Sequence, residues 1–392
     1  MSDDLVLRLG AAMKIVHLIT RLIVGGAQEN TLLSCEGQHD AGHEVTLITG
    51  PALGPEGSLM QRAERYGYRV ETLDAMRRSI LPMKDVVTYR ALVRRLRELA
   101  PDVAHTHSSK AGIIGRYAAH AAGVPRVVHT IHGLAFTASR HAGVNALFRL
   151  LERKAAPLTH RIVSVADAMT RASLAANIGR PEQYVTVHSG MDLAPFLEPP
   201  VPRQPVRARL GLAPEHVAVG TIARLFHMKG HDDLLSLAPK LCSRFPNLRF
   251  VWIGDGILRA EFEAKIAQVK LTDRFIFTGL VPPTQIPELV NALDIVAHPS
   301  QREGLARAIP QAQLARCPVV CYDIDGNAEG LIHGETGYAI QPFDVHAFGE
   351  SLATLIADEA KRRAMGERGR AFASEIFDAK RMVRRLLEVY ES

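Results

Sequence analysis

The sequence predicts an α/β protein made of two doubly wound domains, each with a parallel sheet covered by helices on both faces. Strand-like and helix-like segments alternate along almost the whole chain, which implies right-handed crossovers between parallel strands. A chain of 392 residues is also too long for one ordinary hydrophobic core. A proline-rich segment interrupts the alternation near the middle, where we expect a domain boundary.

The first half of the chain contains short apolar runs of the kind found in buried parallel strands. The expected strands are residues 13–20, 43–50, 70–75, 102–108, 127–133, 160–166 and 184–191. The expected helices are residues 25–42, 76–101, 109–123, 142–156 and 167–178. This alternation predicts a first domain at residues 13–195. Residues 1–12 are expected to be a disordered extension, because the first strand-like run starts at Met13.

The proline-rich segment predicts the boundary. Its prolines are Pro195, Pro199, Pro200, Pro202 and Pro205. Proline at this density disfavours a helix or a central strand, so residues 196–206 are predicted to be a stiff linker. The second domain, residues 207–374, has expected strands at 217–224, 248–256, 275–279, 294–300, 317–323 and 337–340. Its helices are expected from 231, from 257, near 284–291, after Glu303, after Gly326 and from 344, and the chain closes with helices at 359–366 and 369–391.

Composition indicates an ordinary globular protein. Apolar residues make up 47% of the chain and charged residues 22%, and no apolar run is long enough to span a bilayer. The N-terminal residues lack the apolar region of a secretory signal, and the four cysteines form no C-x-x-C pair. We therefore expect a cytoplasmic protein with reduced thiols.

The net charge of +6 is concentrated in the predicted helix at residues 76–101. Its predicted buried stripe is Val86, Tyr89, Val93, Leu96 and Ala100, and its exposed cations are Arg90, Arg94, Arg95 and Arg97. A solvated helix face explains this pattern, and so does contact with an anionic membrane surface or a lipid diphosphate. Nucleic acid is not an expected partner, because no aromatic residues interleave with the arginines.

Two glycines, Gly25 and Gly26, follow the first predicted strand and precede its helix. Glycine at this position lets the backbone approach a ligand and leaves N–H groups free. A plain tight turn explains the pair equally well.

Histidines occur at the ends of two further predicted strands: His105, His107, His129 and His132. Imidazole suits zinc, but strand alternation places only His105 and His107 on the same face, and no cysteine or carboxylate completes a tetrahedral set. We therefore expect no metal. His105 and His129 are interpreted as structural, whereas His132, followed by Gly133, can donate to a sugar hydroxyl.

The second half contains a pattern that suits a nucleotide diphosphate bearing a sugar. Arg224 and Lys229 follow a predicted strand, and guanidinium and ammonium groups neutralise phosphate oxygens. Glu303 is followed eight residues later by Gln311, which is expected on the same helix. The free N–H groups at the start of that helix would add partial positive charge that favours a bound phosphate.

Together these motifs resemble those of the retaining family 4 glycosyltransferases. The resemblance implies the GT-B fold: two Rossmann-like domains facing a central cleft, with a C-terminal helix at residues 375–392 packed back on the first domain. The implied catalytic residues are His132, Glu303, Arg224 and Lys229. The implied donor-binding residues are Gly25, Gly26, Arg224, Lys229, Gly254, Gly256, Glu303, Gly304, Leu305 and Gln311. His107 and Lys110, in the segment HSSKAG, resemble residues on the acceptor side.

One residue departs from the family pattern, because Gln311 stands where the second glutamate of the family lies. An amide oxygen can still accept a hydrogen bond from ribose hydroxyls, with less charge assistance. An inactive relative is the alternative interpretation.

We therefore expect a retaining hexosyltransferase that moves a sugar from a nucleotide-diphosphate donor to a glycan or lipid-linked acceptor in cell-surface polysaccharide or glycoconjugate assembly. No cofactor or metal is expected, and the location is cytoplasmic or peripheral on the inner face of the membrane. Two alternatives remain open: a sugar-nucleotide epimerase with the same fold and a non-catalytic nucleotide-binding relative.

Overall fold

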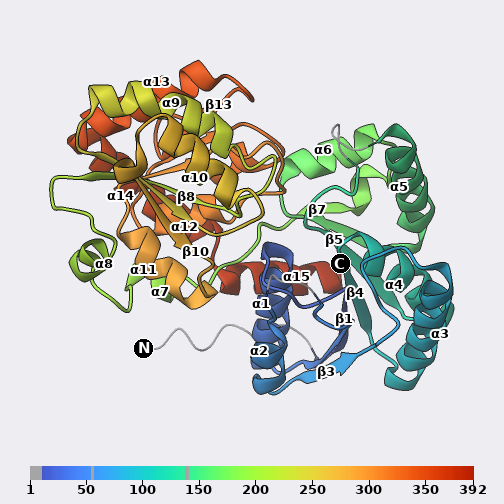
Figure 1. Ribbon diagram of the computed structural model, residues 1–392. Helices are drawn as coiled ribbons and strands as arrows, with labels where there is room; N and C mark the ends of the chain where they lie inside the picture. The colour runs from blue at the N-terminus through green and yellow to red at the C-terminus, as the bar shows by residue number, and fades with distance from the viewer. Residues whose placement is uncertain (1–10, 54–56, 137–140) are drawn as a thin grey trace, which may run out of the picture. The chain divides into compact units, whose positions relative to one another are not determined.

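The computed structural model describes residues 11–53, 57–136 and 141–392. The chain forms two compact units, shown in Figure 1: unit 1 is Met1–Met191 with Ala379–Ser392, and unit 2 is Asp192–Asp378. The expected N-terminal extension, residues 1–12, lies almost entirely outside the described residues. In the described part of the chain no helix combines the length and hydropathy needed to cross a membrane.

Unit 1 is built on a parallel sheet in the order β3-β2-β1-β4-β5-β6-β7. Its strands are β1 (Lys14–Ile19), β2 (Glu44–Thr49), β3 (Arg69–Thr72), β4 (Val103–His107), β5 (Arg126–Ile131), β6 (Arg161–Ser164) and β7 (Tyr184–Thr186). Its helices are α1 (Gly26–Asp40), α2 (Met60–Arg65), α3 (Pro82–Leu99), α4 (Ser109–Ala122), α5 (Ala142–Ala155), α6 (Asp167–Ala175) and α15 (Ala379–Glu391). The order reverses between β1 and β4, and ligands of such sheets bind at the carboxyl ends of the strands at this point.

Side-chain alternation along β1 sends apolar residues to both faces of the sheet of unit 1. Val16 and Leu18 face α3 and α4 and pack with Leu92. Ile15 points to the opposite face, where it packs with Leu386 of α15. The C-terminal helix is therefore part of the core of unit 1, on the face opposite α3 and α4.

Unit 2 has a second parallel sheet, in the order β10-β9-β8-β11-β12-β13. Its strands are β8 (Val217–Ile222), β9 (Leu248–Ile253), β10 (Phe275–Gly279), β11 (Ile295–His298), β12 (Val319–Tyr322) and β13 (Gly337–Ile340). Its helices are α7 (Ala194–Leu197), α8 (Arg203–Arg209), α9 (His231–Arg244), α10 (Arg259–Gln268), α11 (Ile286–Asn291), α12 (Ala308–Leu314), α13 (Val345–Ala357) and α14 (Glu359–Ile376). The order reverses between β8 and β11, so the carboxyl ends of these strands position a candidate site. Two parallel-sheet units of this kind confirm the predicted fold class.

The proline-rich segment differs from the expectation of a linker without helix, because α7 and α8 begin within or beside it. Pro195 and Pro205 lie in the first turns of these helices. The N–H groups of a first turn have no intrahelical partner, so proline removes no hydrogen bond there.

Two helix predictions were also wrong in detail. The buried face of α3 is Thr88, Leu92 and Leu96, whereas Val86 is half exposed. The predicted buried face was wrong because one of the buried positions, Thr88, is a polar residue and does not appear in an apolar pattern. The closing helices meet at Phe377–Asp378 rather than near residue 368, because α14 continues to Ile376.

Candidate functional site

The carboxyl ends of β8 and β11 bring together Lys229, His298 and Glu303. The Lys229 Nζ atom lies 2.5 Å from Oε1 of Glu303, and the His298 Nε2 atom lies 3.3 Å from the same oxygen. Burial alone would raise the pKa of the Glu303 carboxyl, but the Lys229 ammonium and the His298 ring hold this pKa well below its usual range. The Glu303 side chain is therefore an ionised carboxylate at neutral pH, paired with an ammonium group.

A glycine allows this pair to form. Gly230 has a φ of 75°, which favours glycine, and it is the N-cap of α9. A Cβ atom at this position would collide with the carbonyl oxygen of Pro299. The Lys229–Gly230 turn consequently lies directly against the end of β11, and the first N–H groups of α9 follow it.

Glu303 does not lie on the same helix as Gln311, contrary to the prediction. It lies in the loop between β11 and α12, which begins at Ala308. The backbone N–H of Glu303 donates to Oδ2 of Asp325 at 2.8 Å, and the N–H of Gly326 donates to the carbonyl oxygen of Gly304 at 2.7 Å. These bonds from the loop after β12 hold the carboxylate in place. Asp325 lies in a different loop from Glu303, so no motif in the sequence indicates its contact with Glu303.

Arg224 is exposed, and its guanidinium lies 4.9 Å from the centre of the Phe226 ring. Its loop packs against the loop after β9, where Cβ atoms on Gly254 and Gly256 would collide with the carbonyl oxygens of Ala223 and Leu225. The two predicted glycines therefore set the path of the arginine loop. Arg224 itself remains open to solvent and to an anion.

The remaining predicted residues of unit 2 lie around α12. Leu305 is buried, whereas Gln311 is partly exposed on the helix. In unit 1, Gly25 is the N-cap of α1 and Gly26 is its first residue. Both glycines are accessible, and they lie beyond the carboxyl end of β1, where free N–H groups of α1 begin.

In unit 1 the structure brings together histidines from neighbouring strands. His17 on β1, His107 on β4 and His132, which follows β5, are joined by ring-nitrogen distances of 2.9 Å and 3.0 Å. His107 is fully buried, so it reaches a ligand only through His132, which is partly exposed. Burial lowers the pKa of His132 to about 4. His17 lies within an apolar strand, so no motif in the sequence indicates its place beside His107.

The other residues singled out in unit 1 have internal partners. Lys110 forms an ion pair with Asp85 at 2.6 Å and donates to the carbonyl oxygen of Ser79. His105 is buried beside Tyr390 and Thr130, and His129 is buried beside Thr106. These two histidines have structural partners, as interpreted from the sequence.

One group of histidines has the spacing of metal ligands. The nitrogens of His17, His105 and His107 include a set within 4.8 Å of one another. Every ring nitrogen of these residues already lies within hydrogen-bond distance of another side chain. No carboxylate or thiol supplements the three imidazoles among the described residues.

Two family models match the chain, one in each half. The model for "Glycosyltransferase Family 4" matches residues 24–195, and the model for "Glycosyl transferases group 1" matches residues 203–372. These two ranges cover most of the chain.

Curated relatives match over nearly their full length. An Escherichia coli UDP-Gal:alpha-D-GlcNAc-diphosphoundecaprenol alpha-1,3-galactosyltransferase is 28% identical over 352 residues, which are 88% of this chain and 89% of that protein. A GDP-mannose-dependent alpha-(1-6)-phosphatidylinositol monomannoside mannosyltransferase of Mycolicibacterium smegmatis is 26% identical over 88% of this chain and 90% of that protein.

Solved structures confirm the fold. HepE of Anabaena, solved in complex with UDP-glucose, matches with a TM-score of 0.80 at 23% identity, over 97% of this chain and 99% of that chain. WaaG, a glycosyltransferase involved in lipopolysaccharide biosynthesis, matches with a TM-score of 0.74 at 17% identity, over 96% and 99%.

Proposed function

Because the chain belongs to the family 4 and group 1 glycosyltransferases, we propose that this hexosyltransferase uses a nucleotide-diphosphate sugar and retains the configuration of the anomeric carbon. The observation that carries the proposal is the cationic site of unit 2. There Lys229, paired with Glu303 at 2.5 Å, and the exposed Arg224 lie beyond the carboxyl end of β8. The donors named for the two relatives, a UDP-sugar and a GDP-sugar, support this class of substrate.

The reaction breaks the bond between the anomeric carbon and the diphosphate oxygen and forms a bond to an acceptor hydroxyl. In a front-face route, the hydroxyl attacks on the side from which the diphosphate departs, and its proton passes to the leaving phosphate oxygen. The negative charge that develops on the diphosphate is stabilised by Arg224, Lys229 and the N–H groups at the start of α9. We propose that these groups take the role of a divalent cation, so a chelator should leave turnover intact.

His132 is the proposed contact to the reacting sugar from unit 1. It follows β5, near the reversal of strand order, and burial keeps its ring neutral at physiological pH by lowering the pKa to about 4. A neutral imidazole can form a hydrogen bond with a sugar hydroxyl, and it carries no positive charge that would attract the diphosphate. Its role is therefore to orient the sugar rather than to bind the nucleotide.

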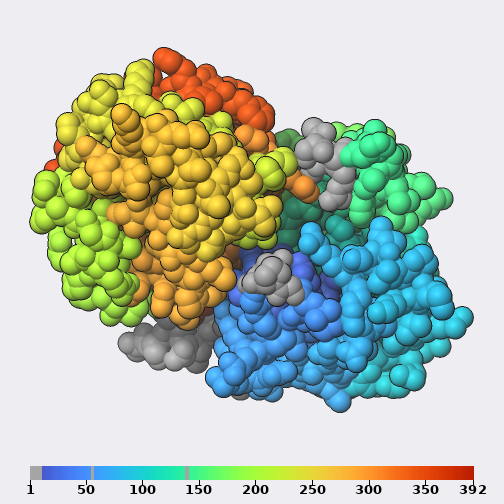
Figure 2. Space-filling model, viewed as in Figure 1, coloured from blue at the N-terminus to red at the C-terminus, as the bar shows by residue number. Residues whose placement is uncertain are grey.

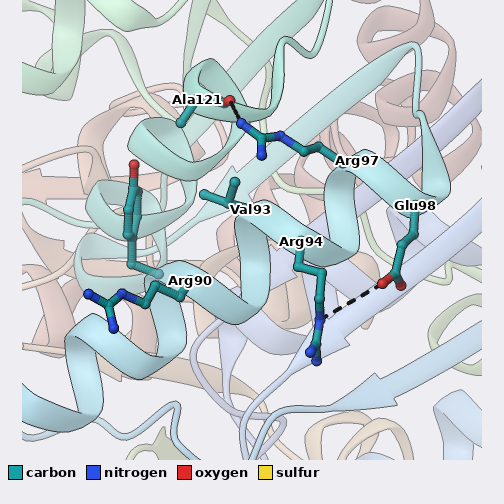
Figure 3. Close-up of a pocket in the computed structure, with 7 residues that line it drawn as sticks. Arg90, Val93, Arg94, Arg97, Glu98 and Ala121 are labelled. Atoms are coloured by element: carbon teal, nitrogen blue, oxygen red, sulfur yellow. Dashed lines mark hydrogen bonds and ion pairs between the residues drawn. The ribbon is translucent and has the colours of Figure 1, made fainter.

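A lipid-linked acceptor fits a surface of unit 1. The start of α3 and the segment before it expose Ile80 (62%), Met83 (86%) and Val87 (56%). Figure 2 shows this light-blue region on the surface of unit 1. Farther along α3, Figure 3 shows a shallow groove edged by the exposed Arg90 and Arg94. Exposed apolar side chains beside cations suit an anionic membrane surface.

Vesicle sedimentation tests this membrane contact. The protein should sediment with phosphatidylglycerol vesicles and remain in the supernatant with phosphatidylcholine vesicles. The double variant Arg90→Glu and Arg94→Glu should lose the binding, because these arginines supply the attraction to the anionic headgroups. A protein that stays in the supernatant with phosphatidylglycerol vesicles would remove the membrane from the proposal.

The function is tested by following the anomeric proton of UDP-glucose, UDP-galactose, UDP-N-acetylglucosamine and GDP-mannose by NMR. Each donor is offered with and without a lipid-diphosphate-linked sugar as acceptor. We expect one donor to be consumed in an acceptor-dependent manner, with the product in the donor's anomeric configuration. Conversion without acceptor would indicate the epimerase, and binding without turnover of any donor would indicate the non-catalytic relative.

A further inference from the structure

The histidines of unit 1 form one hydrogen-bonded row that ends at His132. Nδ1 of His17 lies 2.9 Å from Nε2 of His107, and Nδ1 of His107 lies 3.0 Å from Nε2 of His132. At the inner end of the row, Nε2 of His17 lies 2.7 Å from Oε1 of Gln38, whose Nε2 donates to the hydroxyl of Tyr390 at 3.0 Å. The rings of His17 and His107 are stacked at an angle of 14°.

Each imidazole ring in this row is neutral and carries one proton, on either Nδ1 or Nε2. Burial lowers the pKa of His17 to about 4 and holds that of His107 well below its usual range. A neutral imidazole has one N–H donor and one nitrogen acceptor, so each ring that donates at one end must accept at the other. The protons of His17, His107 and His132 are therefore coupled.

The direction of the row is set at its inner end. The structure assigns Oε1 of Gln38 to the side of His17, and a carbonyl oxygen can only accept. His17 must then donate from Nε2 and accept at Nδ1 from Nε2–H of His107. His107 in turn accepts at Nδ1 from Nε2–H of His132.

Tyr390 is the partner of the amide nitrogen of Gln38 in this orientation. Its hydroxyl accepts from Gln38 and lies 2.5 Å from Nδ1 of His105, to which it can donate its own proton. His105 is bonded on its other side to Thr130 at 2.6 Å. A rotated Gln38 amide would reverse every bond in the row and place the proton of His132 on Nδ1.

We propose that Gln38 and Tyr390 are positioning residues that act through His17 and His107 to keep the proton of His132 on Nε2, leaving Nδ1 as a hydrogen-bond acceptor for a substrate hydroxyl. This differs from the donor role expected for His132 from the sequence. The tautomer follows from the row itself, whereas the contact to substrate rests on the proposed function. A residue of the last helix, Tyr390, thereby influences a candidate catalytic residue after β5.

The tautomers are measured directly in the full-length protein with 15N-labelled histidine. Two-bond 1H–15N correlation spectra at pH 7.5 distinguish a protonated ring nitrogen from an unprotonated one, and a His132→Gln spectrum identifies the signals of His132. We expect protonated Nε2 and unprotonated Nδ1 for His132, unchanged after EDTA. A proton on Nδ1, an equal mixture of tautomers, or a spectrum altered by EDTA because His17, His105 and His107 hold a metal would overturn the proposal.

Variants at the inner end test the coupling. In Gln38→Met and in Tyr390→Phe the direction of the row is no longer fixed, so His132 should show both tautomers. The control is Tyr184→Phe, which removes a hydroxyl that donates to the carbonyl oxygen of Ile178 in the same unit at 2.8 Å, and it should leave His132 unchanged. Circular dichroism checks that each variant is folded. If the tautomer of His132 is unchanged in both folded variants, the coupling is contradicted. The wild-type spectrum determines the tautomer independently of the variants.

Kinetics separate this inference from the proposed function. With the donor found by NMR, kcat of Gln38→Met should fall in proportion to the share of molecules that carry the proton on Nδ1, about 2-fold for an equal mixture of tautomers, while the nucleotide Kd stays unchanged, because those molecules lack one hydrogen bond to the sugar. A wild-type protein without turnover would contradict the proposed function and leave the measured tautomer standing. An unchanged kcat in a variant with mixed tautomers would show that Nδ1 of His132 does not contact the reacting sugar.

Discussion

Replacing Lys229 by methionine should destabilise unit 2 in a pH-dependent manner. The side chains of Lys229 and Glu303 are only 22% and 17% exposed, so the substitution leaves a carboxylate mostly buried without its ammonium partner. Breaking a fully buried pair typically costs about 3–5 kcal/mol. Partial exposure, together with His298 at 3.3 Å, leaves an expected loss of about 2–3 kcal/mol at pH 8.

The sign of the pH dependence follows from the two pKa shifts. In the wild type the pKa of Glu303 is held below its usual range, so the pair stabilises the fold above about pH 4 and this contribution is lost on further acidification. In Lys229→Met, burial is the dominant influence and raises the pKa of Glu303. Its carboxyl then takes up a proton as the pH falls, which removes the cost of the buried charge. The gap between wild type and variant should therefore be smaller at pH 5 than at pH 8.

Urea unfolding monitored by tryptophan fluorescence measures this gap. Trp252 is the single tryptophan of the chain and is fully buried in the core of unit 2, so it reports on the relevant unit. Arg224→Met is the matched control, because Arg224 is exposed, and its free energy of unfolding should change by less than about 0.5 kcal/mol. Equal stability of Lys229→Met and wild type at pH 8, or a gap that does not shrink at pH 5, would refute the reasoning.

Four further changes have expected results. Arg224→Ala should lower kcat/KM about 100-fold through loss of a phosphate contact, measured by initial rates, and a change within a few-fold would contradict that contact. Gln311→Glu should strengthen nucleotide binding by about 1 kcal/mol in calorimetry if it bonds ribose hydroxyls, whereas complete loss of binding would show that it faces an anion or an apolar group. His132→Ala should abolish transfer but keep nucleotide affinity; lost affinity with normal turnover at saturation would contradict its place at the sugar. Gly230→Ala should lower both Tm and nucleotide affinity, because a Cβ collides with the carbonyl oxygen of Pro299 and φ is 75°, and a wild-type Tm would argue against this strain.

The sequence was sufficient to predict the order of strands and helices, because buried parallel strands are short apolar runs separated by helix-length segments. It was also sufficient to place Arg224 and Lys229 in the loop after a strand, whereas Glu303 was wrongly expected on the helix of Gln311. The pairing of Lys229 with Glu303 could not be predicted, because it depends on β8 and β11 being neighbours in the sheet. The structure also distinguishes the two cationic residues, because Lys229 is ion-paired with Glu303 whereas Arg224 is exposed.

The histidine row lay beyond prediction from the sequence. His17 looked like one polar residue in an apolar strand, and only the register of β1 with β4, which places His17 opposite His105, brings it near His107. Tyr390 lies at the far end of the chain, and its contact with Gln38 depends on the packing of α15 on unit 1. Such contacts depend on tertiary structure and leave no local periodicity to detect.

The central claim is that unit 2 binds a nucleoside diphosphate through Arg224 and Lys229. Isothermal titration of the full-length protein with UDP, GDP and ADP, in buffer containing EDTA, measures this most directly. We expect one of the three nucleotides to bind clearly more tightly than the others, and Arg224→Ala to weaken that binding at least 10-fold. Absence of binding by all three nucleotides, or equal affinity in the variant, would contradict the claim.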